Sequence, residues 1–201
     1  MGLVLAFDTA THRATVAVVD GERVVGERIT RSHRVLADAH EILAAAGAGP
    51  SDIEAVVVGT GPGSFTGIRL GLAAAQGFAL GVPVTVAGVS TLDALAKGAP
   101  GALPVIDGGR REVFSIVDGQ PRSLAAGDLP VPGEATCVGD GAVRYRAVLE
   151  ENGAHVPPDD AEVHVPYARH HVALAFAAGD FGPAERIEPL YVRPPDAKAP
   201  A

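Results

Sequence analysis

Several residue types that would indicate particular functions are scarce in this sequence. The 201 residues include a single cysteine, no tryptophan and only 4% aromatic residues. Cys137 cannot form an intramolecular disulfide, and its apolar neighbours predict a buried side chain rather than a nucleophile. The rarity of cysteine is typical of a reducing compartment, so a cytoplasmic location is expected.

Positive charge is also in short supply. Lysine and arginine total 16 against 24 aspartate and glutamate residues, which gives a net charge of −8 at pH 7. Proteins bind nucleic acids through clustered cations and exposed aromatic rings. We therefore expect this chain to make little contact with RNA alone, and any RNA substrate would be held mostly by another subunit.

No apolar run reaches the roughly 20 residues that a membrane-spanning helix needs. The longest candidate, residues 70–82, contains Gln76 and three glycines. The apolar residues 1–7 lack a basic leader and are interrupted by Asp8, so no secretion signal is expected. The sequence predicts a soluble protein.

The apolar pattern of the first half predicts the element order β-β-β-α-β-α-β-α. Continuous apolar runs predict buried strands, Asp20-Gly21 predicts a hairpin, and apolar residues at helical spacing predict helices. The predicted strands are 3–7, 14–19, 24–29, 53–58 and 82–86, and the predicted helices are 32–46, 66–80 and 91–97. An antiparallel meander followed by alternating elements implies an α/β fold with a mixed sheet covered by helices.

Glycine and proline in residues 97–104 predict a hinge between a larger lobe, 1–98, and a smaller one, 99–193. The elements predicted for the second lobe are strands 103–107, 112–117, 135–139 and 189–192, and helices 142–152 and 172–178. Residues 194–201, rich in proline and alanine, are expected to form a disordered tail.

A glycine-rich turn separates the strand ending at residue 58 from the next helix. The stretch Gly-Pro-Gly-Ser-Phe-Thr-Gly-Ile-Arg at 61–69 closely resembles the signature of the TsaB (YeaZ) family. Further stretches that fit the family are 5–11, 33–47, 105–114, 138–142 and 188–196. The resemblance therefore covers nearly the whole chain. It implies the two-lobed actin/hexokinase/Hsp70-like (ASKHA) ATPase fold, with mixed sheets flanked by helices and a truncated second lobe.

The resemblance also implies a function. The implied role is a non-catalytic scaffold, or dimerization subunit. It would belong to the complex that transfers threonylcarbamoyl to N6 of adenosine 37 in ANN-decoding tRNAs. The implied partners are a TsaD-type catalytic subunit, which requires this chain for activity, and a TsaE-type ATPase. A homodimer is implied when the chain is alone. The tRNA would be met only through the complex, and no membrane partner is implied. ATP and a metal ion are expected on partner subunits, and no cofactor on this chain.

The helix predicted at 66–80 is apolar nearly all round, so more than one side of it must be covered. One stripe is expected to cover the sheet, and it consists of Ile68, Leu72, Ala75 and Ala79. A second stripe and the preceding helix are expected to contact the partner through His33, Leu36, Gly67, Gly71, Ala74 and Phe78. The alternative is that the chain's own second lobe or first helix covers this stripe. On the partner interpretation, Gly71→Trp should abolish assembly and leave the chain folded.

The glycine-rich turn has two interpretations. Glycines before a helix N-terminus can bind phosphate, but no Lys-Ser/Thr pair follows them, so the turn is not a Walker A loop. A tight strand-to-helix turn with Ser64 or Thr66 as N-cap is the simpler interpretation. The signature residues singled out here are Gly61, Pro62, Gly63, Ser64, Phe65, Thr66 and Arg69.

Four residues form a candidate vestigial nucleotide site. Asp8, Thr9 and Thr11 lie where active ATPases of this fold hold phosphate and metal-bound water, although Asp8 could equally cap its own loop. Asp107 opens an Asp-Gly-Gly turn that resembles a phosphate-binding turn, but Arg110-Arg111 follow it. The alternative function is therefore a small active ASKHA-type kinase or ATPase that uses these residues.

Other catalytic and metal-binding patterns are missing. The sequence has no His-x-x-x-His pair, which would place two metal ligands on one helix face, and no Gly-x-Ser-x-Gly nucleophile elbow. Neither a metal site nor any catalytic residue is predicted for this chain.

Overall fold

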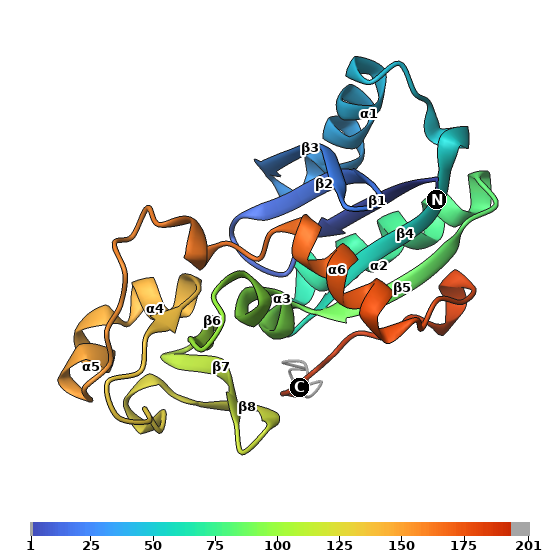
Figure 1. The fold of residues 1–201 in the computed structure, drawn as a ribbon. Helices are drawn as coiled ribbons and strands as arrows, with labels where there is room; N and C mark the ends of the chain where they lie inside the picture. Colours follow the sequence, from blue (N-terminus) through green and yellow to red (C-terminus); the bar gives the residue numbers. More distant parts are fainter. Residues whose placement is uncertain (1, 194–201) are drawn as a thin grey trace.

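The computed structural model describes residues 2–193, and the tail predicted at 194–201 lies outside the described residues (Figure 1). The first half contains the predicted elements in the predicted order, although the strand predicted at 82–86 lies at 85–90. They are β1 (Leu3–Asp8), β2 (Ala14–Asp20), β3 (Arg23–Thr30), α1 (Val35–Ala45), β4 (Ile53–Gly61), α2 (Phe65–Gly81), β5 (Thr85–Ser90) and α3 (Thr91–Gly98). A 3₁₀ turn, Ser32–Arg34, leads into α1.

The five strands form one mixed sheet in the order β3-β2-β1-β4-β5. The first three strands are antiparallel neighbours, as predicted, whereas β4 lies parallel to both β1 and β5. Parallel pairing requires a crossover that covers a face of the sheet, and α2 supplies it between β4 and β5. The mixed α/β fold predicted from the apolar pattern is confirmed.

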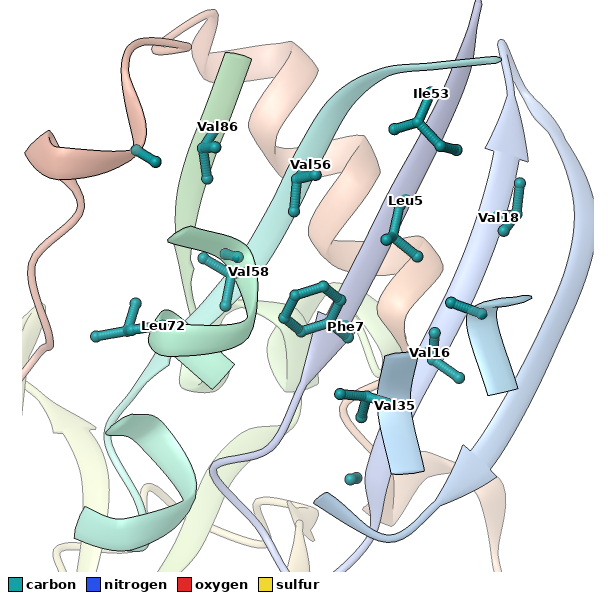
Figure 2. Packing of buried hydrophobic residues seen from close by; sticks show 14 of the residues in the cluster. Leu5, Phe7, Val16, Val18, Val35, Ile53, Val56, Val58, Leu72 and Val86 are labelled. Carbon is teal, nitrogen blue, oxygen red and sulfur yellow. The ribbon is translucent and has the colours of Figure 1, made fainter. Parts of the chain in front are cut away.

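Alternate side chains of a strand point to opposite faces of the sheet. Apolar side chains line both faces here, and helices cover both of them. On one face, Val35 of α1 and Leu72 of α2 pack around Phe7 of β1, which is fully buried (Figure 2). On the other face, Val172 and Ala175 pack against the sheet from α6 (Ala168–Ala178), the last helix (Figure 1). The chain therefore returns to its first sheet after building the second.

The second sheet has the order β8-β7-β6-β9. Its strands are β6 (Leu103–Gly109), β7 (Glu112–Val117), β8 (Gln120–Ala125) and β9 (Cys137–Val138). Two short helices lie beside it in Figure 1, α4 (Asp140–Arg144) and α5 (Arg146–Glu151), and they replace the single helix predicted at 142–152. Cys137 is fully buried, as predicted, and burial raises the pKa of its thiol to about 11.

Three further local features differ from what the sequence predicted. Strand β8 was not predicted, and α6 begins at Ala168 rather than at residue 172. The strand predicted at 189–192 is wrong, because the amide of Leu190 makes a single backbone hydrogen bond to the Thr60 carbonyl (2.9 Å) and no ladder forms. β4 is already paired on both edges, with β1 and β5, so it has no free edge for another strand.

Helix α3 joins the two sheets. Its Leu92 and Leu95 are buried against Ile106 of β6 and Phe114 of β7. The division into lobes 1–98 and 99–193 stays a prediction. Within residues 2–193, no helix combines the length and the apolar character needed to cross a bilayer.

Candidate functional site

The carboxylate of Asp8, at the end of β1, is buried and held by the chain itself. The Ala10 amide donates to Oδ1 (2.6 Å), and the Thr91 hydroxyl (2.7 Å) and His171 Nε2 (2.8 Å) donate to Oδ2. His171 Nδ1 lies 3.2 Å from the Tyr167 carbonyl oxygen.

The surroundings of Asp8 favour its ionised form. Burial alone would raise the pKa of the Asp8 carboxyl. The hydrogen bond and charge of His171, helped by the other two donors, outweigh burial and hold this pKa below its ordinary value of 3.8. Of the two roles left open by the sequence, this geometry favours a carboxylate that caps its own loop and anchors α6.

The two threonines that follow Asp8 also face the chain's own backbone. The Thr9 hydroxyl donates to the Gly67 carbonyl (2.7 Å), and the Thr11 hydroxyl donates to the Arg13 carbonyl (3.1 Å). Both side chains are buried. The Thr9 hydroxyl therefore holds the turn after β1 against the start of α2, whereas the Thr11 hydroxyl bonds within the turn itself.

Asp107 lies near the end of β6 in the second sheet. Its carboxylate accepts the Gly109 amide (2.9 Å), an Arg144 guanidinium N–H (2.5 Å) and the Tyr145 hydroxyl (3.3 Å). Arg110 and Arg111 both have positive φ angles, 54° and 67°, between the paired residues Gly109 and Glu112. Positive φ at both central positions is the geometry of a two-residue hairpin turn. Asp107, Gly108 and Gly109 are thus the end of β6, and Arg110-Arg111 form the turn of its hairpin with β7.

A cleft of about 640 Å³ lies between the two sheets and brings most of the predicted site residues together. Thr9, Thr11 and residues 62–68 line it from the side of the first sheet, and Asp107 lines it from the second sheet. Asp8 does not line the cleft. Among residues 2–193, no group of three or more His, Cys, Asp or Glu side chains is arranged to hold a metal ion.

The signature loop is shaped by close packing. Of the two predicted N-cap candidates, Ser64 is the N-cap of α2, and its Oγ accepts the Gly67 amide at 3.3 Å. The Ser64 amide donates to the Ala10 carbonyl at 2.7 Å. A Cβ at Gly63 would collide with the Ala10 carbonyl oxygen, and one at Gly67 with that of Thr9. Glycine is needed here because the turn after β1 lies directly on the start of α2.

The remaining signature residues hold the C-terminal segment of the described chain. Arg69 stacks on the Phe65 ring (3.8 Å to the centroid) and donates through Nε to the Tyr191 hydroxyl (3.1 Å). Phe65 and Tyr191 stack with centroids 5.3 Å apart. Two residues further on, Arg193 pairs with Glu112 of β7 (2.5 Å). No sequence pattern singled out Tyr191, although it lies in one of the stretches that fit the family.

The predicted partner stripe on α2 needs correction. Gly67 and Gly71 are buried, and a Cβ at position 71 would collide with the Thr9 hydroxyl. Ala74 and Phe78 are half-buried against the first core. The chain itself therefore covers Gly67 and Gly71, through the turn after β1 rather than through the second lobe or the first helix. For Ala74 and Phe78, contact with a partner stays a prediction.

A different side of α2 is exposed. Leu70 is 39% exposed and Leu80 86%, and Ala73 and Gly77 lie exposed between them at helical spacing. On α1 and the turn before it, Leu36 is 41% exposed and His33 is also exposed, so these two predicted residues are accessible. We call this surface the outer face, defined by His33, Leu36, Leu70, Ala73, Gly77 and Leu80.

Comparisons with known proteins agree with the resemblance. The family model "TsaD: tRNA N6-adenosine threonylcarbamoyltransferase" matches residues 15–167. The chain is 34% identical to "tRNA threonylcarbamoyladenosine biosynthesis protein TsaB" of Escherichia coli (strain K12), over 94% of each chain. It is 31% identical to the protein of the same name from Bacillus subtilis (strain 168), over 56% of this chain and 53% of that protein.

A solved structure shares the fold. It is "YeaZ from Pseudomonas aeruginosa", with a TM-score of 0.75 and 27% identity, covering 95% of this chain and all of that chain. The likeness extends over both sheets, so it confirms the predicted two-sheet α/β architecture.

Proposed function

Because this chain belongs to the TsaB (YeaZ) family, we propose that it is a non-catalytic scaffold subunit in tRNA threonylcarbamoyladenosine biosynthesis. It docks on a TsaD-type catalytic subunit, which depends on it for activity, and a TsaE-type ATPase joins the assembly. ATP, metal and tRNA are bound mainly by the partners. The chain contributes contacts that favour the active conformation of the catalytic subunit.

The outer face carries this proposal. Leu36, Leu70 and Leu80 are large apolar side chains left exposed on helices whose other sides are buried in the first core. Exposed apolar surface of this kind marks protein interaction sites. Ala73 and Gly77 are small, and nothing lies within 4 Å of a Cβ placed at Gly77, so a partner helix can approach α2 closely.

The setting of Asp8 supports a non-catalytic role. An acid that binds a metal or a metal-bound water must reach solvent or substrate, but Asp8 is 1% exposed and lies outside the cleft. Freeing its carboxylate would leave the Thr91 hydroxyl and His171 buried without an acceptor, which is costly.

The test compares two helix substitutions matched in exposure. Leu70→Glu places a charge on the outer face, and Val148→Glu places one on α5, where Val148 is 37% exposed. Each variant is mixed with the TsaD-type protein of the same organism, and mass is measured by light scattering. Formation of threonylcarbamoyladenosine is assayed with the TsaE-type ATPase and the enzyme that supplies the threonylcarbamoyl donor.

We expect Leu70→Glu to weaken the complex by about 30-fold or more, as for a central interface side chain, and to lower product formation in parallel. Val148→Glu should behave as wild type. If Leu70→Glu assembles as fully as wild type, the outer face is not the surface that binds the catalytic subunit. ATP turnover by the isolated wild-type chain would favour the alternative, a small ASKHA-type ATPase.

Gly71→Trp is no longer suitable for this test. Position 71 is filled by the Thr9 side chain, so a bulky residue there would disturb the chain's own fold. A loss of assembly in that variant would therefore report unfolding rather than a lost contact.

A further inference from the structure

The last described residues, 189–193, run from the first sheet toward the second (Figure 1). At the first sheet, the Leu190 amide donates to the Thr60 carbonyl of β4 at 2.9 Å. Tyr191 stacks on Phe65, at the start of α2, with ring centroids 5.3 Å apart. These contacts attach the segment to the strand and the helix on either side of the signature loop. We call residues 189–193 the strap.

At the second sheet, the strap is held through Arg193. Its Nη1 donates to the Glu112 carboxylate of β7 at 2.5 Å, and its Nη2 donates to the Gly108 carbonyl of β6 at 3.1 Å. Its guanidinium carbon lies 5.9 Å from the centroid of the Phe114 ring. Val192 packs against the core cluster that contains Phe114. One side chain therefore attaches the strap to both strands of the β6–β7 hairpin.

The strap also borders the cleft between the two sheets. Residues 190–193 line the cleft together with Thr9, after β1, and Asp107, in β6. Helix α3 is a further link between the sheets, because Leu92 and Leu95 pack on the second sheet. A segment that is attached on both sides of a cleft limits how far the two sheets can separate, and the packed helix α3 is the pivot for such a movement.

The two ends of the strap differ in strength. The first-sheet end combines a backbone hydrogen bond with an aromatic stack. The second-sheet end depends on an ion pair in which Arg193 is 28% exposed and Glu112 is 36% exposed. Water and salt compete for such a pair, so it breaks more easily than a buried contact. The Ser123 hydroxyl donates to Glu112 at 2.9 Å and keeps the carboxylate in position for the pair to form again.

We propose that the strap is a latch that sets the width of the cleft. With Arg193 on the β6–β7 hairpin, the two sheets are held at their present separation. When Arg193 is released, the second sheet moves away from the first about α3. The two states differ mainly by the contacts of one partly exposed side chain, so both are accessible to the chain. The inference concerns the isolated chain and does not depend on assembly with a partner.

The experiment measures the distance between two spin labels, one on each sheet, in the full chain. The labels are attached through Glu22→Cys, in the turn between β2 and β3, and Gln120→Cys, at the start of β8, because both positions are exposed and lie outside the strap. The native Cys137 is fully buried, and burial raises the pKa of its thiol to about 11, so it should stay unlabelled. Pulsed electron paramagnetic resonance gives the distribution of distances.

Arg193→Ala removes the second-sheet end of the strap. We expect it to raise the fraction of molecules at a longer distance about fivefold, as for the loss of one charged side chain that makes hydrogen bonds. Arg186→Ala is the matched control and should behave as wild type, because Arg186 is 65% exposed and lies 4.0 Å from its partner Asp180. Added salt should increase the longer distance in wild type and have little effect in Arg193→Ala.

Glu112→Gln breaks the same ion pair from its other side. It should raise the longer-distance fraction less than Arg193→Ala does, because the bond from Arg193 to the Gly108 carbonyl remains. Combining it with Arg193→Ala should add nothing further, since both changes act on one contact. Identical distributions in wild type and Arg193→Ala would overturn the proposal. So would an equal increase in Arg186→Ala, or fully additive effects of Glu112→Gln and Arg193→Ala.

Discussion

Asp8 and Asp107 come from the same local pattern and end in different environments. Each follows an apolar run and lies near the end of the first strand of its sheet. Asp8 is buried and bound by His171, which is also fully buried. The Asp107 side chain is 9% exposed, and its partner Arg144 is 56% exposed. The first pair belongs to the core, whereas the second is open to solvent on the wall of the cleft.

The difference follows from what packs on each sheet. Helix α6 returns to the first sheet and carries His171 to the end of β1. At the end of β6, the short helix α4 supplies Arg144 from the surface and Asp140 from its first residue. An aspartate near the end of a strand is therefore a structural anchor in the first sheet, as Asp8, and part of the cleft lining in the second, as Asp107.

The largest expected effect is that of Asp8→Ala. Removing one partner of a buried pair leaves His171 and the Thr91 hydroxyl without an acceptor, which should lower the free energy of unfolding by about 3–5 kcal/mol. Urea titration followed by circular dichroism measures this. A cost below about 1 kcal/mol would mean that Asp8 does not anchor α6.

Acid should break the same contact in the wild-type chain. The folded-state pKa of Asp8 lies below its ordinary value of 3.8, so its contribution is present above that value. The contribution is lost as pH falls through the lowered folded-state pKa. The free energy of unfolding between about pH 5 and about pH 3 should therefore fall more steeply in wild type than in Asp8→Asn. Parallel curves for the two proteins would contradict the assignment.

The smallest expected effect is that of Asp107→Ala. Arg144 is mostly exposed and can turn to solvent when its partner is removed, so the loss of stability should be about 1 kcal/mol or less. The same urea titration measures it, with Asp8→Ala as the matched substitution. A cost as large as that of Asp8→Ala would remove the distinction between the two acids.

Much of the first sheet could be predicted from the sequence, because each of its strands carries its own apolar run. The order of the first eight elements and the N-cap Ser64 followed from local patterns. Strand β8 did not, because Gln120–Ala125 is largely polar and pairs only through β7. The segment predicted as a strand at 189–192 had the apolar residues, but it lies beside β4, which is already paired on both edges.

The candidate interface shows the same limit. Helical spacing defined several apolar stripes on α2 but not which of them the rest of the chain would cover. Thr9 covers Gly67 and Gly71, and it is far from both in the sequence. Only the folded chain therefore showed that Leu70 and Leu80 are exposed while the glycines are buried.

The sequence by itself determined the family, the strands that carry Asp8 and Asp107 at or near their ends, and the glycines that allow the signature turn. The tertiary structure decided what those groups touch. His171 reaches Asp8 from 163 residues away, and Arg144 reaches Asp107 from 37 residues away. Local patterns depend on neighbouring residues, whereas the partner of a buried charge depends on how the whole chain returns on itself.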